Sequence, residues 1–219
     1  MARSLVFPQA GRTSAARQAD RVLVVGIGGS RRPGSSTEQV ITAVLAGLES
    51  QGARTKMYSG QELLFPHYEP DAPLTPAAAD YLAAVRAADA IVLGSPGYHG
   101  GISGLVKNAV DYLEELRDDA VPYLAGKAVG CVTTAYGWQA AVSTLSALRQ
   151  TVHALRGWPT PYGIAMNVAD GLCSLDGRFL DARADESVGI VASQIMQFVS
   201  AFRDAPEPSA PELRACPAR

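Results

Sequence analysis

Apolar residues along this chain form short continuous runs that alternate with longer segments of helical periodicity. The first run, at 22–27, reads Val-Leu-Val-Val-Gly-Ile and leads into glycines, as expected for a central parallel strand that is buried on both faces. Ser35 and Glu38 then form a capping-box pattern, and the apolar residues of 40–48 lie on one helical face. We therefore predict a strand that is followed directly by a helix.

The rest of the chain repeats this order of strand and helix. Parallel strands need long crossover connections, which are usually helices, so the alternation predicts an α/β fold in which helices cover both faces of a parallel sheet. Ligands in such sheets bind at the carboxyl ends of the strands. We expect further strands at 54–58, 90–94, 128–133 and 161–166, helices at 75–88, 103–116, 139–156 and 185–202, and a proline-interrupted loop at 65–76.

The composition fits one compact domain without a global charge. The chain has 219 residues, of which 47% are hydrophobic and 18% charged, and its net charge is -2. A sizeable core is expected, and no overall positive field exists to hold nucleic acid or anionic lipid. We predict a domain at 20–203 between two mobile tails, 1–19 and the proline-rich 204–219, because both ends lack apolar periodicity.

The cysteines and the polar amino end narrow the possible classes of protein further. The three cysteines form no C-x-x-C pair and do not cluster with histidines at metal-ligand spacing, so neither a disulfide framework nor a metal site is expected. The first twenty residues lack an apolar run of the kind that a signal peptide or membrane anchor needs. The expectation is a cytoplasmic protein that does not bind membranes or nucleic acid.

The loop after the first predicted strand has the chemistry of a phosphate site. It reads Gly-Gly-Ser-Arg-Arg-Pro-Gly-Ser-Ser-Thr at 28–37, just before a helix amino terminus. Unpaired amides, the helix dipole, hydroxyl groups and a guanidinium all favour a bound phosphate. The P-loop ending Gly-Lys-Ser/Thr is absent, and a dinucleotide fingerprint would place Arg31 where the third glycine belongs. The competing interpretation is that Ser35 only caps its helix while Arg31 and Arg32 are solvated.

The segment after the strand at 90–94 suits a flat heteroaromatic ring. It reads Ser-Pro-Gly-Tyr-His-Gly-Gly at 95–101 and continues into a helical stretch that contains Lys107, Asn108 and Asp111. Pro96 stiffens the turn, aromatic side chains supply a surface for the ring, and the glycines let backbone amides approach its edge. The competing interpretation is that Tyr98 and His99 are ordinary loop residues.

Both segments resemble motifs of the NADPH-dependent FMN reductase family, over about residues 22–166. Ser30, Arg32, Ser35 and Thr37 match the spacing of its G-S-x-R-x-x-S-x-N signature, with threonine in place of asparagine. Residues 95–113 are similar to its S-P-x-Y-(N/H)-G-x-x-x-G-x-L-K-N-x-x-D-x-L block, with Val106 where leucine is usual. The resemblance implies a flavodoxin-like three-layer αβα sandwich with a five-stranded parallel sheet of order 2-1-3-4-5.

The same resemblance places the phosphate of flavin mononucleotide (FMN) in the first loop and its isoalloxazine ring along the second. A third loop, at 133–139, lies after the next strand and lacks the glycine repetition of related proteins. No catalytic side chain and no metal are expected, because the flavin carries the chemistry. The residues expected to bind the cofactor are Ser30, Arg32, Ser35, Ser36, Thr37, Pro96, Gly97, Tyr98, His99, Gly100, Thr134, Tyr136 and Gly137.

The function that the resemblance implies is an FMN oxidoreductase. NADPH or NADH would give a hydride to FMN and leave, and a small acceptor such as a flavin, quinone, azo compound or nitro compound would follow in a ping-pong cycle. The resemblance also implies a homodimer or homotetramer that pairs through the helix at 103–116. Two alternatives stay open: a flavodoxin-like carrier that passes single electrons between proteins, which the near-neutral charge disfavours, and a regulatory module that senses a phosphorylated ligand.

Overall fold

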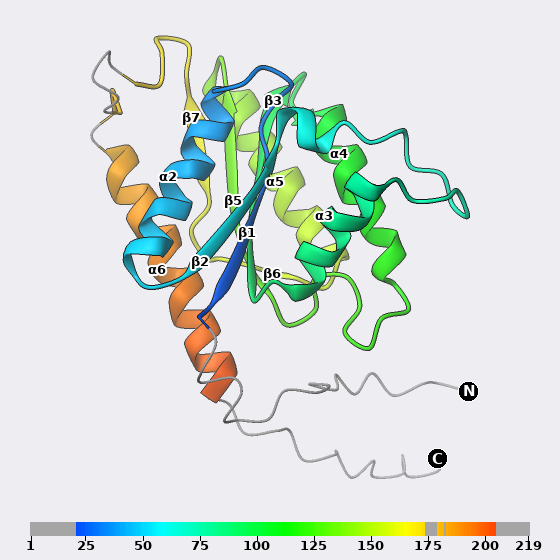
Figure 1. The fold of residues 1–219 in the computed structure, drawn as a ribbon. Coiled ribbons are helices and arrows are strands. Elements are labelled where there is room, and N and C mark those ends of the chain that lie inside the picture. Colours follow the sequence, from blue (N-terminus) through cyan, green and yellow to red (C-terminus); the bar gives the residue numbers. More distant parts are fainter. Residues whose placement is uncertain (1–20, 174–178, 182, 205–219) are drawn as a thin grey trace, which may run out of the picture.

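The computed structural model describes residues 21–173, 179–181 and 183–204, which form three layers with a sheet between two sets of helices (Figure 1). The strands are β1 (Leu23–Gly28), β2 (Arg54–Ser59), β3 (Ala90–Tyr98), β4 (Gly101–Ile102), β5 (Ala128–Ala135), β6 (Trp158–Pro159) and β7 (Ile164–Asn167). The α-helices are α2 (Ser36–Ser50), α3 (Pro76–Ala87), α4 (Gly104–Asp111), α5 (Trp138–Ala154) and α6 (Arg183–Asp204), with short 3₁₀ helices η1 (Gly60–Leu63) and η2 (Tyr112–Leu116).

The sheet confirms the predicted strand order and corrects the number of strands. Its path is β2-β1-β3-β5-β6, and all of these neighbours are parallel, which is the 2-1-3-4-5 order. Two short strands share the fifth position, because both β6 and β7 pair with β5 in parallel. The strand predicted at 161–166 forms only from Ile164 onward, as β7, and β6 lies before the predicted range. β4 adds a short antiparallel pair at the end of β3.

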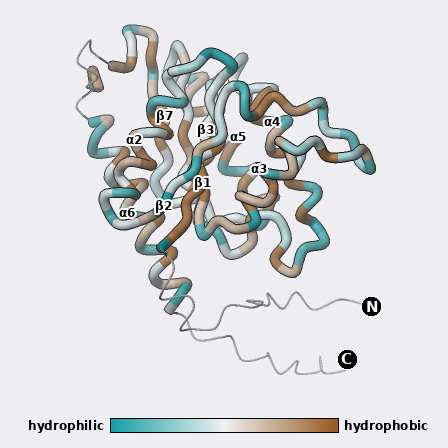
Figure 2. Tube along the Cα trace, in the orientation of Figure 1, coloured by the Kyte–Doolittle hydropathy of each residue, from teal (hydrophilic) through white to brown (hydrophobic). Residues whose placement is uncertain are grey.

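Two hydrophobic clusters lie on opposite faces of the sheet. One joins Val25 and Ile27 of β1 to α3, α4 and α5, and the other joins Val24 of β1 to α2 and α6. Figure 2 shows β1 as a predominantly hydrophobic strand in the middle of the fold. Cys131 of β5 is fully buried, as predicted, and burial raises the pKa of its thiol to about 12. This cysteine is therefore part of the core and not a reactive group.

Side-chain caps define where the first helices begin. The Ser35 side chain accepts from the Glu38 backbone N–H at 3.4 Å, and Thr75 caps α3 in the same way at 3.2 Å, with Pro76 at the first helical position. The predicted capping box is only half formed, because the Glu38 carboxylate accepts from the Gly34 backbone N–H at 3.2 Å instead of the Ser35 N–H. Glu38 therefore closes the preceding loop onto its helix.

The carboxyl end of the long helix α6 is fixed to the edge of the sheet where β1 and β3 begin. The Arg203 guanidinium lies 2.9 Å from the Asp89 carboxylate, and the same carboxylate accepts from the Leu23 backbone N–H at 2.8 Å. One side chain thus joins α6 to the beginnings of β1 and β3. Among the described residues, no helix combines the length and apolar character that a membrane span needs. The predicted tails lie outside the described residues, apart from Asp204 at the end of α6.

Gly28 marks the closest backbone approach between β1 and β3. Its φ of +142° is rare for residues with a side chain, and a Cβ atom there would lie 1.9 Å from the Gly94 carbonyl oxygen. Because the obstacle is backbone, no side-chain movement relieves the clash.

We predict that Gly28→Ala lowers the free energy of unfolding by about 3 kcal/mol or more, since the substitution combines backbone strain with overpacking. Gly52→Ala is the matched control, because Gly52 has a φ of +93° and open space around the added methyl group. Strain alone should cost it about 1 to 2 kcal/mol. Urea denaturation of both variants measures the difference, and equal losses would contradict a specific clash at Gly28.

Candidate functional site

The carboxyl ends of β1, β3, β5 and β7 meet at one rim of the sheet (Figure 1). Gly28 pairs with Gly94, Pro96 with Thr134, and Ala135 with Asn167. These pairings bring the three predicted loops side by side, as the parallel topology requires. The strands extend further than predicted, so that Pro96, Gly97 and Tyr98 belong to β3 and Thr134 belongs to β5.

The first loop carries several donors that an anion can use. Gly29 and Gly34 adopt positive φ angles of 95° and 66°, and a Cβ atom at Gly34 would meet nothing within 4 Å. Within the described part of the chain, no hydrogen bond reaches the backbone N–H groups of Ser36 and Thr37 at the start of α2. Such amides and the helix dipole favour negative charge.

The side chains of this loop divide into exposed and buried groups. Arg31 and Arg32 are exposed, and Ser30 is half-buried with its hydroxyl accepting from the Arg32 backbone N–H at 3.3 Å. Ser35 is buried as the cap of α2, while Ser36 is half-buried. The guanidiniums and the half-buried hydroxyls are therefore the side chains that a solvent-borne phosphate reaches first.

Thr37 connects the first loop to the third. Its hydroxyl lies 2.7 Å from the Thr134 hydroxyl across 97 positions of sequence, and both side chains are buried. Each of these predicted ligands therefore has a protein partner, and neither presents its hydroxyl to solvent as Arg32 presents its guanidinium. Their observed role is to join α2 to the end of β5.

The second loop is a tight hairpin between β3 and β4. Tyr98 pairs with Gly101, and the two central residues, His99 and Gly100, both have positive φ angles, 54° and 80°, as a type I′ turn requires. His99 is exposed, and Tyr98 exposes 55% of its surface. The aromatic side chains thus face solvent beside the first loop, where a planar ligand has access to them.

Polar contacts from both sides hold this hairpin in place. The Ser95 hydroxyl donates to the Pro96 carbonyl at 2.8 Å and accepts from the Ser103 backbone N–H at 2.9 Å. From α5, the Ser143 hydroxyl donates to the Gly100 carbonyl at 3.2 Å and the Thr144 hydroxyl to the Gly101 carbonyl at 3.4 Å. These α5 hydroxyls were not among the predicted site residues, and only their position early in the helix after the third rim loop could have indicated them.

Gly97 is required by the same contact with α5. A Cβ atom at this position would lie 2.8 Å from the Thr144 hydroxyl oxygen and 3.1 Å from the Ala140 carbonyl oxygen. The absence of a side chain therefore lets α5 approach the hairpin closely enough for its hydroxyls to bond the turn.

The third loop is short and exposed. Tyr136 exposes 79% of its surface, Gly137 precedes the first residue of α5, and Trp138 exposes 53%. Trp138 is therefore not a core residue. Tyr98 of the second rim loop and Tyr136 of the third rim loop are exposed aromatic side chains. Both loops contact the start of α5.

Asn108 has a structural role away from the rim loops. Its carbonyl oxygen accepts from the Tyr68 backbone N–H at 2.9 Å, and its amide nitrogen donates to the Pro66 carbonyl at 2.9 Å. Lys107 and Asp111 form an ion pair at 2.5 Å on the same helix. Asn108 thus anchors the proline-interrupted loop onto α4.

Solved structures place this architecture in the flavodoxin-like class. The NAD(P)H:(acceptor) oxidoreductase flavoenzyme of Paracoccus denitrificans aligns over 83% of this chain and 97% of its own, with a TM-score of 0.63 and 19% identity. A flavodoxin, WrbA-like protein of Agrobacterium tumefaciens aligns over 84% of this chain and 99% of its own, with a TM-score of 0.55 and 17% identity. At these identities the likeness establishes the fold.

The family model for NADPH-dependent FMN reductase matches residues 22–170, and the chain belongs to this family. A curated relative, the FMN-dependent NADPH-azoreductase of Staphylococcus aureus, is 34% identical over 116 residues. That match covers 52% of this chain and 58% of the azoreductase, so the chain spans little more than half the length of the curated relatives it matches. The family assignment confirms the resemblance that the two loop motifs indicated.

We predict that Thr37→Val and Thr134→Val each lower the free energy of unfolding by about 1 to 3 kcal/mol, because each leaves a buried hydroxyl without its partner. The double variant should lose less than the sum of the single losses, by about 1 kcal/mol. Urea denaturation of the four proteins completes the cycle. Strictly additive losses would show that the two hydroxyls do not interact.

Proposed function

We propose that FMN binds across this rim, with its phosphate at the 28–37 loop and its ring along the hairpin at 96–101. The observation that carries this proposal is the convergence of the two segments. The Gly28–Gly94 pairing and the Thr37–Thr134 hydrogen bond bring an anion-favouring helix start to the same rim as a hairpin with exposed aromatic side chains. Family membership supports the choice of FMN.

The residues present fit such a cofactor. The N–H groups of Ser36 and Thr37 and the exposed guanidinium of Arg32 supply donors for a phosphate. Tyr98 and the backbone of His99 and Gly100 supply a surface and an edge for a planar ring. Thr37 and Thr134 serve mainly by fixing the loops, since their hydroxyls bond each other. The other residues proposed for the site, including Tyr136 and Gly137, either lie at the surface of the rim or hold the rim loops in place.

The reaction that we propose is hydride transfer from NADPH or NADH and onward reduction of a small acceptor, such as a flavin, quinone, azo compound or nitro compound. When bound, FMN supplies the redox chemistry for both halves of this reaction. The protein would hold the donor and then the acceptor at the same place over the rim loops, and ping-pong kinetics follow if the oxidised nicotinamide nucleotide leaves before the acceptor binds. A similar reaction is named for the azoreductase and the Paracoccus flavoenzyme.

The proposed assembly is a homodimer or homotetramer in the cytoplasm, in which copies pair through the helix that begins at Gly104. The support for this assembly is the family resemblance, which implies pairing through this helix. Light scattering of the purified chain gives the number of copies.

The decisive experiment is an FMN titration of the purified protein followed by an assay of NADPH oxidation with a quinone. We expect a saturable flavin spectrum and turnover that depends on both substrates. Parallel lines in a double-reciprocal plot at several quinone concentrations indicate the ping-pong cycle. Saturable FMN binding without any NADPH oxidation would favour the electron-carrier alternative.

We predict that Arg32→Ala weakens FMN binding by about 10-fold to 100-fold, because it removes a charge-assisted hydrogen bond of roughly 1.5 to 3 kcal/mol. Arg54→Ala is the matched control, since Arg54 is an exposed arginine at the start of β2, at the opposite rim. Fluorescence titration of FMN measures both affinities. Equal affinities for the two variants would remove Arg32 from the phosphate site.

A further inference from the structure

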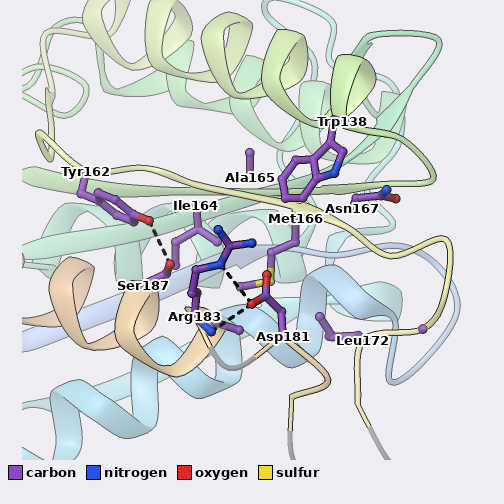
Figure 3. Close-up of a pocket in the computed structure, with 12 residues that line it drawn as sticks. Trp138, Tyr162, Ile164, Ala165, Met166, Asn167, Leu172, Asp181, Arg183 and Ser187 are labelled. Atoms are coloured by element: carbon purple, nitrogen blue, oxygen red, sulfur yellow. Dashed lines mark hydrogen bonds and ion pairs between the residues drawn. The ribbon is translucent and has the colours of Figure 1, made fainter.

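A pocket of about 210 Å³ lies beside β7 (Figure 3). Its apolar wall comes from Ile164, Met166 and Leu172. Figure 3 shows Trp138 entering from the start of α5 on one side and Arg183 and Ser187 from the start of α6 on the other. None of the thirteen residues predicted to bind the cofactor lines this pocket.

The pocket is adjacent to the rim site and distinct from it. Met166 in its wall pairs with Thr134, and Asn167 pairs with Ala135, so the two sites lie on neighbouring strands. Trp138 directly follows Gly137 of the third rim loop. A molecule that lies over the rim loops and extends past Trp138 therefore reaches the pocket.

Hydrogen-bond donors dominate the polar groups of the pocket. Asp181 accepts from the Arg183 backbone N–H at 3.0 Å and from its Nε at 3.4 Å, and among the described residues no hydrogen bond occupies the two terminal nitrogens of that guanidinium. The Asn167 carbonyl oxygen accepts from the Ala169 backbone N–H at 3.1 Å, which leaves the amide nitrogen as a donor. The Tyr162 and Ser187 hydroxyls bond each other at 2.9 Å.

Charges of both signs lie near the pocket, so direct hydrogen bonds contribute more to the binding of an anion than the net electrostatic field does. The backbone N–H of Arg183, followed by its guanidinium, lowers the pKa of Asp181, which therefore stays ionised at neutral pH and offsets the charge of Arg183. Asp185 and Glu186 add negative charge in the first turn of α6. An anion is thus held here only if it accepts hydrogen bonds from the Arg183 guanidinium itself.

The volume limits the ligand to one ring. A protein cavity of about 150 Å³ binds benzene, whereas pockets for drug-sized ligands begin near 300 Å³. At 210 Å³ the pocket accommodates one benzene ring with one small substituent. An isoalloxazine ring system is too large for it.

We propose that this pocket binds a single aromatic ring that carries a carboxylate, with the ring between Trp138 and the apolar wall and the carboxylate on the Arg183 guanidinium. Resting on the proposed function, the ring belongs to the electron acceptor, so that this end of the acceptor determines which compounds are reduced. The substrate class is then aromatic acceptors with a carboxylate-bearing ring.

Binding is tested first on the FMN-free protein, which separates this proposal from the proposed function. The chain has two tryptophans, so Trp158→Phe leaves Trp138 as the only indole reporter. We expect 4-nitrobenzoate to quench its fluorescence along a saturable curve. Arg183→Gln should weaken this binding about tenfold or more, as for the loss of one charge-assisted hydrogen bond. It should change the binding of uncharged nitrobenzene by less than about threefold.

Arg54→Gln is the matched control, because Arg54 is exposed and outside both sites. Quenching that does not saturate, or an equal loss of 4-nitrobenzoate affinity in both arginine variants, would overturn the pocket assignment. So would displacement of the probe by FMN, measured by calorimetry, since the probe would then occupy the rim site. A protein that binds the probe but not FMN would retain the pocket and lose the proposed function.

The role as an acceptor site is tested on the FMN-loaded protein. The acceptor is azobenzene-4-carboxylate, in which the carboxylate-bearing ring fills the pocket while the azo group and the second ring extend to the rim. The reaction is the two-electron reduction of the azo group to a hydrazo group, with a hydride from NADPH and one proton from solvent, so that no group leaves. Arg183→Gln should raise the KM for azobenzene-4-carboxylate about tenfold and leave its kcat unchanged, while both constants for azobenzene stay constant. Equal changes for the two acceptors would show that Arg183 does not select the carboxylate.

Discussion

The close contact between β1, β3 and α2 is the constraint on which the rim depends. Gly28 and Gly94 let two backbones meet without side chains between them. A Cβ atom at Gly94 would lie 2.6 Å from the Ile41 side chain and 3.1 Å from the Thr37 side chain, so its absence lets α2 sit directly on the sheet. That position brings Thr37 within hydrogen-bond distance of Thr134. One side-chain-free contact therefore sets where the first and third loops lie.

The hairpin has its own support from the other face of the sheet. Hydroxyl groups of α5 bond two of its carbonyls, and Ser95 joins its base to the start of α4. The loops are thus held by protein contacts before any ligand is present. Such preorganisation reduces the ordering cost of binding, and it is typical of sites built on rigid elements.

Local patterns were sufficient for most of the fold. The apolar runs and the capping residue Thr75 predicted β1 and α3 to within one residue at each end, and Ser35 predicted where α2 begins. The parallel strand order followed from the family resemblance. The extension of β3 through Tyr98 was missed because it depends on pairing with β5 and β4, which are not neighbours that sequence periodicity reports. The short strand β6 was missed for the same reason, since it is defined by its pairing with the beginning of β5.

The loops that form the candidate site were predictable from the sequence, but the roles of their individual residues were only partly so. Hydroxyl-rich and glycine-rich segments after strands indicated the rim, and the structure brings them together there. Burial of Thr37 against Thr134 was not predictable, because the two residues are 97 positions apart. The pocket beside β7 was not predictable either, since its walls come from α5, β7, α6 and the segment before α6.

The left-handed turn at His99 has a consequence for substitution over evolution. Because this residue has a φ of +54° and an exposed side chain, the backbone restricts its identity more than side-chain contacts do. Asparagine, aspartate and histidine tolerate this conformation better than most residues. The motif that this segment resembles takes asparagine or histidine at this position, two residues of different acid–base chemistry. Asparagine and histidine can replace each other at a position where selection acts on the main-chain conformation and not on the imidazole.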